Sequence, residues 1–426
     1  YIVKIFYKSV SFNIAIYKSS INLHKNLRVI EKYYIMLMKC SLHSNLLKGE
    51  VFMSANKFKE MLRKKVAVLY GGGQIPSANI VLGKLMEWLI SMKCVVYGIH
   101  KSYMGLADEA CYEKFTITKA QQIQKQIGTY LETCRNVDPS ANEWFDRIIV
   151  LLSKFNIHKL FICGGDGSVR AATDFEKKCE EIGYDMRIMF IPCTIDGING
   201  SLSIGRQSAI AESIRRVSSM IVNSFATWDA GLIGPRIPII ELQGRNRNDI
   251  IVNVMKRLIK EEDIGRYKIS DINLICVPSG HMWSYVKLIN SILKTDKLTA
   301  IIVAEGAKPI EQWWEAISGK GIGEKLFNLI NLSRVKGKPI KKANLDVVGY
   351  LSQTNDLISK EESDEINLWT LAATIHATKC NSEVIIKKGT QIACIKLQDL
   401  RQLNPNSKEP EILSEEDLKL LKPYLP

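Results

Sequence analysis

The sequence lacks closely paired cysteines and long apolar runs. Its 10 cysteines include no Cys-x-x-Cys pair, and Cys163 and Cys276 stand inside apolar, strand-like runs. Buried free thiols in a reducing compartment are therefore expected. No apolar stretch approaches the roughly 20 residues that a membrane-spanning helix needs. We accordingly expect a cytoplasmic protein without a membrane partner.

Positive charge interleaved with aromatic residues is also missing. No such run of Lys and Arg occurs, so nucleic acid is not an expected partner. The formal net charge is +14, but residues 1–52 supply six of these charges, with eight Lys and Arg against Glu31 and Glu50. The remaining chain is mildly basic, which suits anionic small molecules.

Residues 1–52 differ in composition from the rest of the chain. They are rich in Ile, Tyr, Asn and Lys, and they end just before Met53. We interpret them as an extension that takes no part in the fold. A basic targeting leader is the alternative.

From Lys65 onward, compact apolar runs alternate with helix-length segments. Because these runs are apolar almost throughout, they are typical of parallel strands that are covered on both faces. Their number indicates two doubly wound parallel-sheet α/β units. The predicted strands are Val66–Tyr70, Cys94–Ile99, Lys159–Cys163, Met186–Ile191, Ile237–Leu242, Ile272–Val277, Ala300–Ala304 and Leu345–Leu351.

Two of these predicted strands end in glycine-rich turns. The first is followed by the three glycines 71–73 and a helical segment, so the backbone can approach a phosphate closely at a helix N-terminus. The other leads into Gly164-Gly-Asp-Gly-Ser168, which presents Asp166 at the sheet edge. Asp166 can hold Mg²⁺ beside phosphate oxygens, while Gly167 leaves space for a nucleotide. A helix cap is the alternative role for Ser168.

A third motif, Ile191-Pro-Cys-Thr-Ile-Asp196, follows another predicted strand. Asp196 is placed to accept the proton of an attacking hydroxyl, as phosphoryl transfer requires. A turn-forming aspartate is the alternative interpretation.

In their order along the chain, these motifs resemble those of the phosphofructokinase family. Glu241-Leu-Gln-Gly-Arg245 and Val303-Ala-Glu-Gly306 extend the resemblance, which covers about residues 65–388. It implies a larger donor-binding domain, residues 53–208 with about 350–400. It also implies a smaller sugar-phosphate-binding domain, residues 209–349 with about 401–426, and assembly into a homodimer or homotetramer.

The resemblance assigns roles residue by residue. Asp196 matches the family's base, Asp166 its metal ligand, and Arg135 the arginine that reaches the transferring phosphate. Thr194 is a further catalytic position, and Thr194 and Asp196 also belong to the sugar-phosphate site. Arg236 matches an arginine that contacts the sugar's phosphate across a subunit boundary. The remaining positions are Gly72, Gly73, Tyr103, Gly165, Gly167 and Ser168 for the donor, and Gln243, Gly244, Arg245, Glu305 and Tyr350 for the sugar phosphate.

Some positions depart from the family pattern. Ile198 stands where a second acidic residue is usual, and Gln353 stands where an arginine is expected at the sugar phosphate. Pyrophosphate-using members usually place Asp and Lys where this chain has Gly167 and Cys193. These two small residues therefore leave room for the rest of a nucleotide.

These matches predict a 6-phosphofructokinase that transfers the γ-phosphoryl group of ATP, with Mg²⁺, to the 1-hydroxyl of fructose 6-phosphate in glycolysis. Pyrophosphate is the alternative donor, because Gln74 and the Thr-Ile-Asp-Gly form at 194–197 look like the long pyrophosphate-using branch. A second alternative is a non-catalytic regulatory protein with the same fold, because Ile198 and Gln353 replace expected charged residues.

Overall fold

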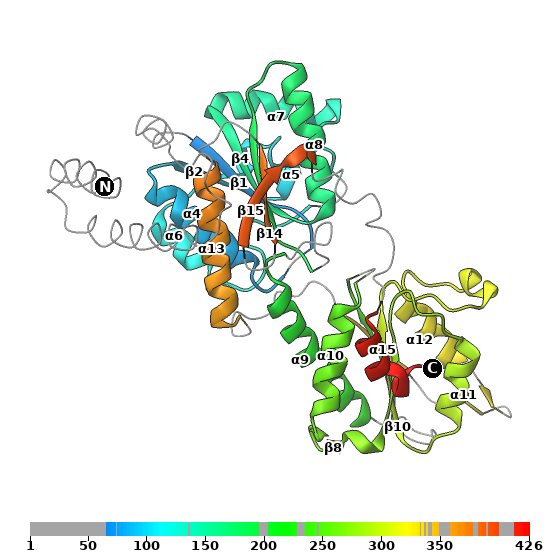
Figure 1. Cartoon of the computed structure of the whole chain (residues 1–426). Coiled ribbons are helices and arrows are strands. Elements are labelled where there is room, and N and C mark those ends of the chain that lie inside the picture. Colours follow the sequence, from blue (N-terminus) through cyan, green and yellow to red (C-terminus); the bar gives the residue numbers. More distant parts are fainter. Residues whose placement is uncertain are drawn as a thin grey trace. The chain divides into compact units, whose positions relative to one another are not determined.

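A computed structural model describes residues 65–426 apart from 74, 135–136, 196–202, 228–234, 245–246, 333, 336–337, 340–342, 349–357, 378–381, 389–390 and 400–412. This part of the chain contains two larger β-sheets, each with helices packed on both faces (Figure 1). The predicted α/β class is therefore confirmed. The division into two domains at the boundaries given above stays a prediction.

The first sheet consists of β1 (Lys65–Tyr70), β2 (Val95–Ile99), β3 (Tyr112–Lys114), β4 (Ile157–Gly164), β5 (Arg187–Pro192), β14 (Glu383–Lys388) and β15 (Gln391–Lys396). These strands lie in the order β15-β14-β5-β4-β1-β2-β3. β1 pairs in parallel with β2 and β4, and β5 pairs in parallel with β4 and β14.

Both edge strands of this sheet run antiparallel to their neighbours, so the predicted parallel sheet is mixed at its edges. β3 runs antiparallel to β2, and β15 runs antiparallel to β14. Only two residues separate the end of β14 at Lys388 from the start of β15 at Gln391. A parallel connection needs a dozen or more residues, so this short connection requires a hairpin.

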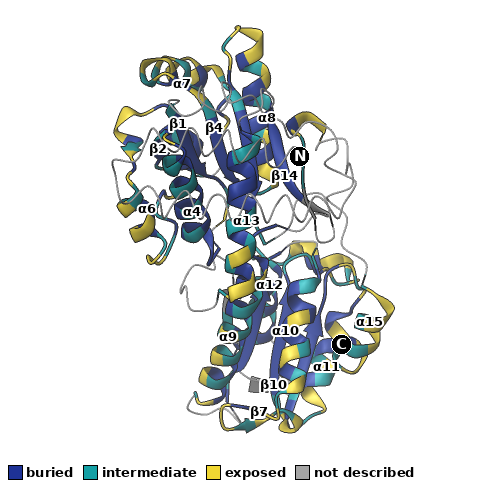
Figure 2. Ribbon diagram, turned by 60° about the vertical axis from the view of Figure 1, so that its left-hand side comes forward, coloured by how far each residue is buried: buried dark blue, intermediate teal, exposed yellow. Residues whose placement is uncertain are grey.

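Side chains of β1 alternate between the two faces of the sheet. Val66, Val68 and Tyr70 join one hydrophobic core, and Ala67 and Leu69 join the other. A strand that is apolar throughout is thus buried on both sides, as Figure 2 shows for the central strands. The first core is covered by α4 (Ala78–Ser91), α6 (Ile117–Ile123) and α13 (Lys360–His376), and the second by α5 (Ser102–Gly105), α7 (Asn142–Phe155) and α8 (Asp166–Glu181).

The strand order reverses between β1 and β4. The chain proceeds from β1 to β2 on one side and from β4 to β5 on the other. In open α/β sheets a crevice opens outside the carboxyl ends of the strands at such a reversal, and ligands bind there. The turns that follow Tyr70 and Gly164 lie at this point.

The second sheet is parallel throughout, with the order β13-β6-β10-β9. Helices α9, α10 and α15 contribute to the core on one face, and α11 and α12 to the core on the other. The bounds are β6 (Ile237–Leu242), β9 (Ile272–Val277), β10 (Leu298–Ala304), β13 (Ala343–Val348), α9 (Arg206–Phe225), α10 (Asp249–Lys260), α11 (Tyr285–Leu293), α12 (Ile322–Leu332) and α15 (Glu415–Leu421).

Short elements complete the described chain. Two small hairpins pair β7 (Asp263–Ile264) with β8 (Tyr267–Lys268) and β11 (Arg334–Val335) with β12 (Lys338–Pro339). Eight cysteines in the described residues are free thiols, and six of these are buried. No described helix has both the length and the apolar character to cross a membrane.

A buried carboxyl group connects the start of α9 with the start of α13. Glu362 is 2% exposed, and its Oε1 accepts a hydrogen bond from the Ser208 hydroxyl at 2.9 Å. Burial raises the pKa of Glu362 above its ordinary value, because burial disfavours the charged form. Glu361, the preceding residue, is exposed, and hydrogen bonds from its own backbone N–H and from Ser359 lower its pKa.

This contrast predicts a pH-dependent effect of Glu362→Gln. The pKa of the Glu362 carboxyl is higher in the folded state than in the unfolded state. Its contribution to the stability of the fold is therefore complete at a pH below the unfolded-state pKa, and it is lost as the pH rises through the folded-state pKa. Glutamine mimics the protonated carboxyl and does not titrate. Relative to the wild type, the variant should therefore gain in melting temperature between pH 4.5 and pH 7.5, measured by thermal unfolding. Glu361→Gln, the matched control, should show a small change of opposite sign, and parallel curves for wild type and Glu362→Gln would contradict the prediction.

Candidate functional site

Glycines allow the ends of β1 and β4 to touch at the strand-order reversal. The Gly71 N–H donates to the Cys163 carbonyl at 2.8 Å. A Cβ atom on Gly164 would press against the Gly71 carbonyl oxygen, and one on Gly71 would press against the Ser168 hydroxyl. Gly72 adopts a φ of +106°, a conformation that glycine tolerates far better than other residues. Close backbone packing therefore explains why both turns are glycine-rich.

Helix α8 starts directly at this strand-order reversal. Gly165 is its N-cap residue, and no side chain caps the helix. Asp166 and Gly167 in the first turn are exposed, and a Cβ atom on Gly167 would meet no atom within 4 Å. The helix N-terminus thus presents a carboxylate and open space, in a setting where the helix dipole favours a phosphate. Ser168 is buried inside the first turn, so the alternative in which it caps the helix is wrong.

Two buried tyrosine hydroxyls bond to the main chain of these turns. Tyr70 donates to the Gly73 carbonyl at 2.9 Å, and its oxygen lies 3.5 Å from the Cys193 carbonyl. Tyr103 donates to the Ser168 carbonyl at 2.6 Å and is 4% exposed. Burial raises the pKa of both tyrosines far above the ordinary value, so both hydroxyls remain hydrogen-bond donors. The predicted contact of Tyr103 with a nucleotide stays a prediction.

The third predicted motif, which follows β5, contacts the turn after β4. The Cys193 N–H donates to the Gly164 carbonyl at 2.9 Å. A Cβ atom on Gly165 would lie 3.1 Å from the Thr194 Oγ1, so Thr194 borders the turn before Asp166. The Cys193 side chain points elsewhere, because it is 1% exposed in the core beside Tyr70 and burial raises its pKa to about 12. Cys193 therefore does not make room for a nucleotide, whereas Gly167 borders open space.

Part of the predicted sugar-phosphate site gathers at the carboxyl ends of β6 and β10. The Gly244 N–H donates to the Glu305 carboxylate at 3.2 Å, and the Glu305 N–H donates to the Leu242 carbonyl at 3.0 Å. Gly244 has a φ of +134°, a region that is nearly exclusive to glycine. Gln243 is half-buried beside it. This edge holds a carboxylate in a fixed position at the strand ends.

Asn248 is a supporting residue that the sequence reasoning missed. Its side-chain amide donates to the Ser279 carbonyl at 3.0 Å and accepts from the Ser279 N–H at 2.8 Å. Both residues are almost fully buried. This reciprocal pair attaches the segment after β9 to the segment after β6. Its partner lies 31 residues away along the chain, so the pairing is not visible in the sequence.

Glu241, which belongs to the fourth family motif, has a structural contact. Its Oε2 accepts a hydrogen bond from the Gly323 N–H, near the start of α12, at 2.7 Å. The side chain is buried, and burial raises its pKa above the ordinary value. A Cβ atom on Gly323 would lie 2.8 Å from the same oxygen. This carboxyl group therefore attaches α12 to the sheet.

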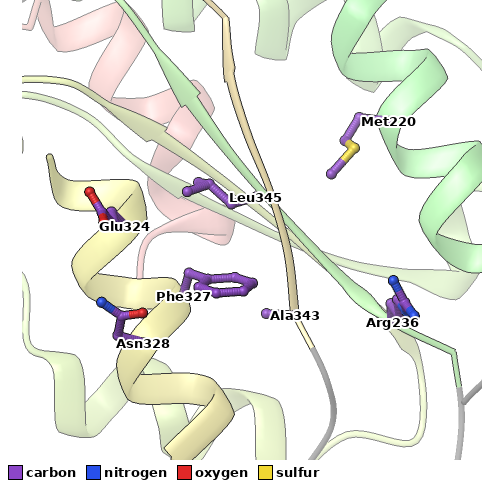
Figure 3. Close-up of a pocket in the computed structure, with 7 residues that line it drawn as sticks. All are labelled: Met220, Arg236, Glu324, Phe327, Asn328, Ala343 and Leu345. Carbon is purple, nitrogen blue, oxygen red and sulfur yellow. The ribbon is translucent and has the colours of Figure 1, made fainter. Parts of the chain in front are cut away.

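Arg236 lies away from Gln243, Gly244 and Glu305. It precedes β6, whereas the other three follow the carboxyl ends of β6 and β10. The pocket that it lines has a volume of about 470 Å³. Its other lining residues come from α9, α12 and the edge strand β13 (Figure 3): Met220, Glu324, Phe327, Asn328, Ala343 and Leu345. A contact across a subunit boundary stays a prediction for Arg236.

Several predicted positions lie outside the described residues. These are the base Asp196, the arginines Arg135 and Arg245, Tyr350, the departures Ile198 and Gln353, Gln74, and the extension 1–52. Their roles stay predictions.

Comparison with known proteins identifies a family with the same sequence motifs. The sequence pattern of the phosphofructokinase family matches residues 65–356. The chain belongs to the phosphofructokinase family. An ATP-dependent 6-phosphofructokinase from Staphylococcus epidermidis is 31% identical over 189 residues, which is 44% of this chain and 55% of the relative. A Staphylococcus aureus enzyme of the same description matches with the same identity and coverage. The match thus spans about half the length of these curated relatives.

Solved phosphofructokinase structures share the fold. The structure from Saccharomyces cerevisiae matches with a TM-score of 0.55 and 17% identity over 84% of this chain and 49% of that chain. A pyrophosphate-dependent phosphofructokinase from Nitrosospira multiformis matches with a TM-score of 0.58 and 14% identity, over 84% of this chain and 90% of that one. At such low identities the likeness concerns the phosphofructokinase fold alone.

The glycine contacts predict opposite outcomes for two Gly→Ala variants. Gly164→Ala should lower the free energy of unfolding by about 1–3 kcal/mol, because overpacking against a backbone oxygen displaces the turn. Gly167→Ala should leave it unchanged or slightly higher, because the new methyl group enters open space. Denaturant unfolding with a common m-value measures both. Equal stabilities of the two variants would show that the contact between β1 and β4 is looser than described.

Proposed function

We propose that this chain is a 6-phosphofructokinase that transfers the γ-phosphoryl group of ATP to the 1-hydroxyl of fructose 6-phosphate. The observation that carries the proposal is the first turn of α8 at the strand-order reversal. It combines the exposed Asp166 carboxylate with open space at Gly167. The relatives described as ATP-dependent 6-phosphofructokinases support the choice of donor.

The donor phosphates would lie between the Gly71–Gly73 turn and the start of α8. Glycine at position 72 lets the main chain approach the phosphates closely, and the N-terminal end of a 16-residue helix favours negative charge. Tyr70 and Tyr103 hold both turns in place through main-chain carbonyls. Such preorganised positions supply most of the catalysis in phosphoryl transfer.

Magnesium fits the Asp166 position. The side chain is an exposed carboxylate at a strand-to-helix turn, and Mg²⁺ prefers oxygen ligands, with the rest of its shell supplied by water and donor phosphates. When bound, the ion offsets charge on the transferring phosphoryl group. Asp166 would hold it, while Thr194 borders the same turn.

The acceptor half of the site rests on Asp196 and the second sheet. We assign Asp196 as the base that takes the proton of the sugar hydroxyl, on the basis of its place two residues after Thr194. Glu305, held by the Gly244 N–H, would accept hydrogen bonds from sugar hydroxyls. Arg135, Arg245, Tyr350 and, from a second subunit, Arg236 would contact phosphate or sugar.

The separate roles of the two aspartates are testable. Asp196→Asn should lower kcat for fructose 6-phosphate by about 10²–10⁴-fold, because the base is lost, while the KM for ATP changes little. Asp166→Asn should instead raise the Mg²⁺ concentration that gives half-maximal rate. Asp146→Asn, on the exposed surface of α7, serves as the control and should behave like the wild type. If the wild type turns over fructose 6-phosphate with neither ATP nor pyrophosphate, the proposal is wrong.

Donor choice should depend on Gly167. A carboxylate at this position would fill the space for the rest of the nucleotide and repel the third phosphate group, which pyrophosphate lacks. Gly167→Asp should therefore lose at least about tenfold in kcat/KM for ATP, about 1.4 kcal/mol of transition-state stabilisation. Activity with pyrophosphate should not fall. Gly167→Asn matches the aspartate in size without its charge, so comparing the two variants in a donor-swap assay separates volume from repulsion. Unchanged ATP kinetics in Gly167→Asp would place the nucleotide elsewhere.

A further inference from the structure

Three side chains that bind metals well meet on the first sheet, outside the proposed phosphoryl-transfer site. His376 is the last residue of α13, Glu383 is the first residue of β14, and Cys394 lies in β15. One ligand atom from each lies within 4.8 Å of the other two. His376 Nδ1 and the Glu383 Oε2 are 2.8 Å apart.

Strand register explains how the three side chains meet. In the β14–β15 hairpin, Ile385 pairs with Cys394 and Glu383 pairs with Lys396. Glu383 and Cys394 are therefore diagonal neighbours on one face of the hairpin. Ile385 and Cys394 pack in the core that α13 covers, and α13 ends with His376 above that face.

The chemistry of this set favours a particular class of cation. An imidazole nitrogen, a carboxylate oxygen and a thiolate together suit Zn²⁺ and similar transition metals, whereas Mg²⁺ prefers oxygen ligands alone. Bonds of about 2.0–2.3 Å would bring the ligand atoms to roughly 3.5 Å from one another. The observed spacing needs only small side-chain movements to reach this value. Three protein ligands leave a fourth position for water.

We propose that His376, Glu383 and Cys394 form a binding site for a zinc-type divalent cation. The site joins the end of α13 to the β14–β15 hairpin. Within the described residues, β14 of this hairpin pairs with β5 at Glu383–Met189 and Val384–Phe190. A bound cation would therefore fasten α13 to this edge of the sheet and stabilise the folded chain.

Cobalt titration of the full chain tests the site directly. Chelator-treated protein, without nucleotide or sugar phosphate, should bind one Co²⁺ at this site with a thiolate-to-cobalt charge-transfer band in the near ultraviolet. Zn²⁺ should displace the cobalt. An all-oxygen site such as the one at Asp166 gives no such band, so the result is independent of the proposed kinase activity.

Variants identify the ligands. Cys394→Ser should abolish the band, and His376→Ala and Glu383→Gln should weaken Co²⁺ binding at least tenfold. Cys134→Ser and His158→Ala are matched controls that should leave the band unchanged, because a half-buried thiol and an exposed imidazole elsewhere are removed. Zn²⁺ at 100 times its Kd should also raise the unfolding free energy of the wild type by about 2.7 kcal/mol and that of Cys394→Ser by much less.

Several outcomes would overturn the proposal. The first is that the wild type shows no charge-transfer band. The second is that the band survives in a folded Cys394→Ser variant. The third is that His376→Ala and Glu383→Gln saturate at the same Co²⁺ concentration as the wild type. The last two variants keep the test decisive if circular dichroism shows that Cys394→Ser does not fold.

Discussion

The close approach of main chain to main chain at the carboxyl ends of β1 and β4 is the constraint on which the first sheet's site depends. The Gly71 N–H bonds to the Cys163 carbonyl, and there is no room for a Cβ atom on Gly71 or Gly164. Because the two turns touch, the glycines that follow β1 and the first turn of α8 lie side by side at this point. Rigid donors aimed at a phosphate need no reorganisation during the reaction.

Buried polar side chains hold these turns in place, and they also hold the segments after β6 and β9 in the second sheet. Tyr70 and Tyr103 bond to main-chain carbonyls, and Asn248 pairs with the main chain of Ser279 on both sides. Each of these groups would be costly to leave unsatisfied in a core. These hydrogen bonds therefore hold the turns in one arrangement. The position of the exposed Asp166 depends on that arrangement.

Sequence patterns predicted the strands well and the side-chain contacts poorly. Apolar runs located the eight strands from Val66 onward because burial on both faces leaves a continuous signal. Three strands of the first sheet, β3, β14 and β15, were not predicted. The β14–β15 hairpin depends on a two-residue connection at 389–390, a local feature that periodicity does not report. Glycine motifs identified the turns at the carboxyl ends of β1 and β4, because a close backbone approach restricts the residue type.

Contacts between segments that are distant along the chain could not be predicted from the sequence. Cys193 was interpreted as a space-making residue at the donor site, yet its thiol faces the core beside Tyr70. Successive side chains of a strand point to opposite faces of the sheet. Cys193 follows the last residue of β5, Pro192, so the sequence alone does not tell which face its side chain takes. Likewise, His376, Glu383 and Cys394 have no metal-binding spacing along the chain. Hairpin register and the position of α13 bring them together, so a cluster of this kind becomes visible only after the sheet is assembled.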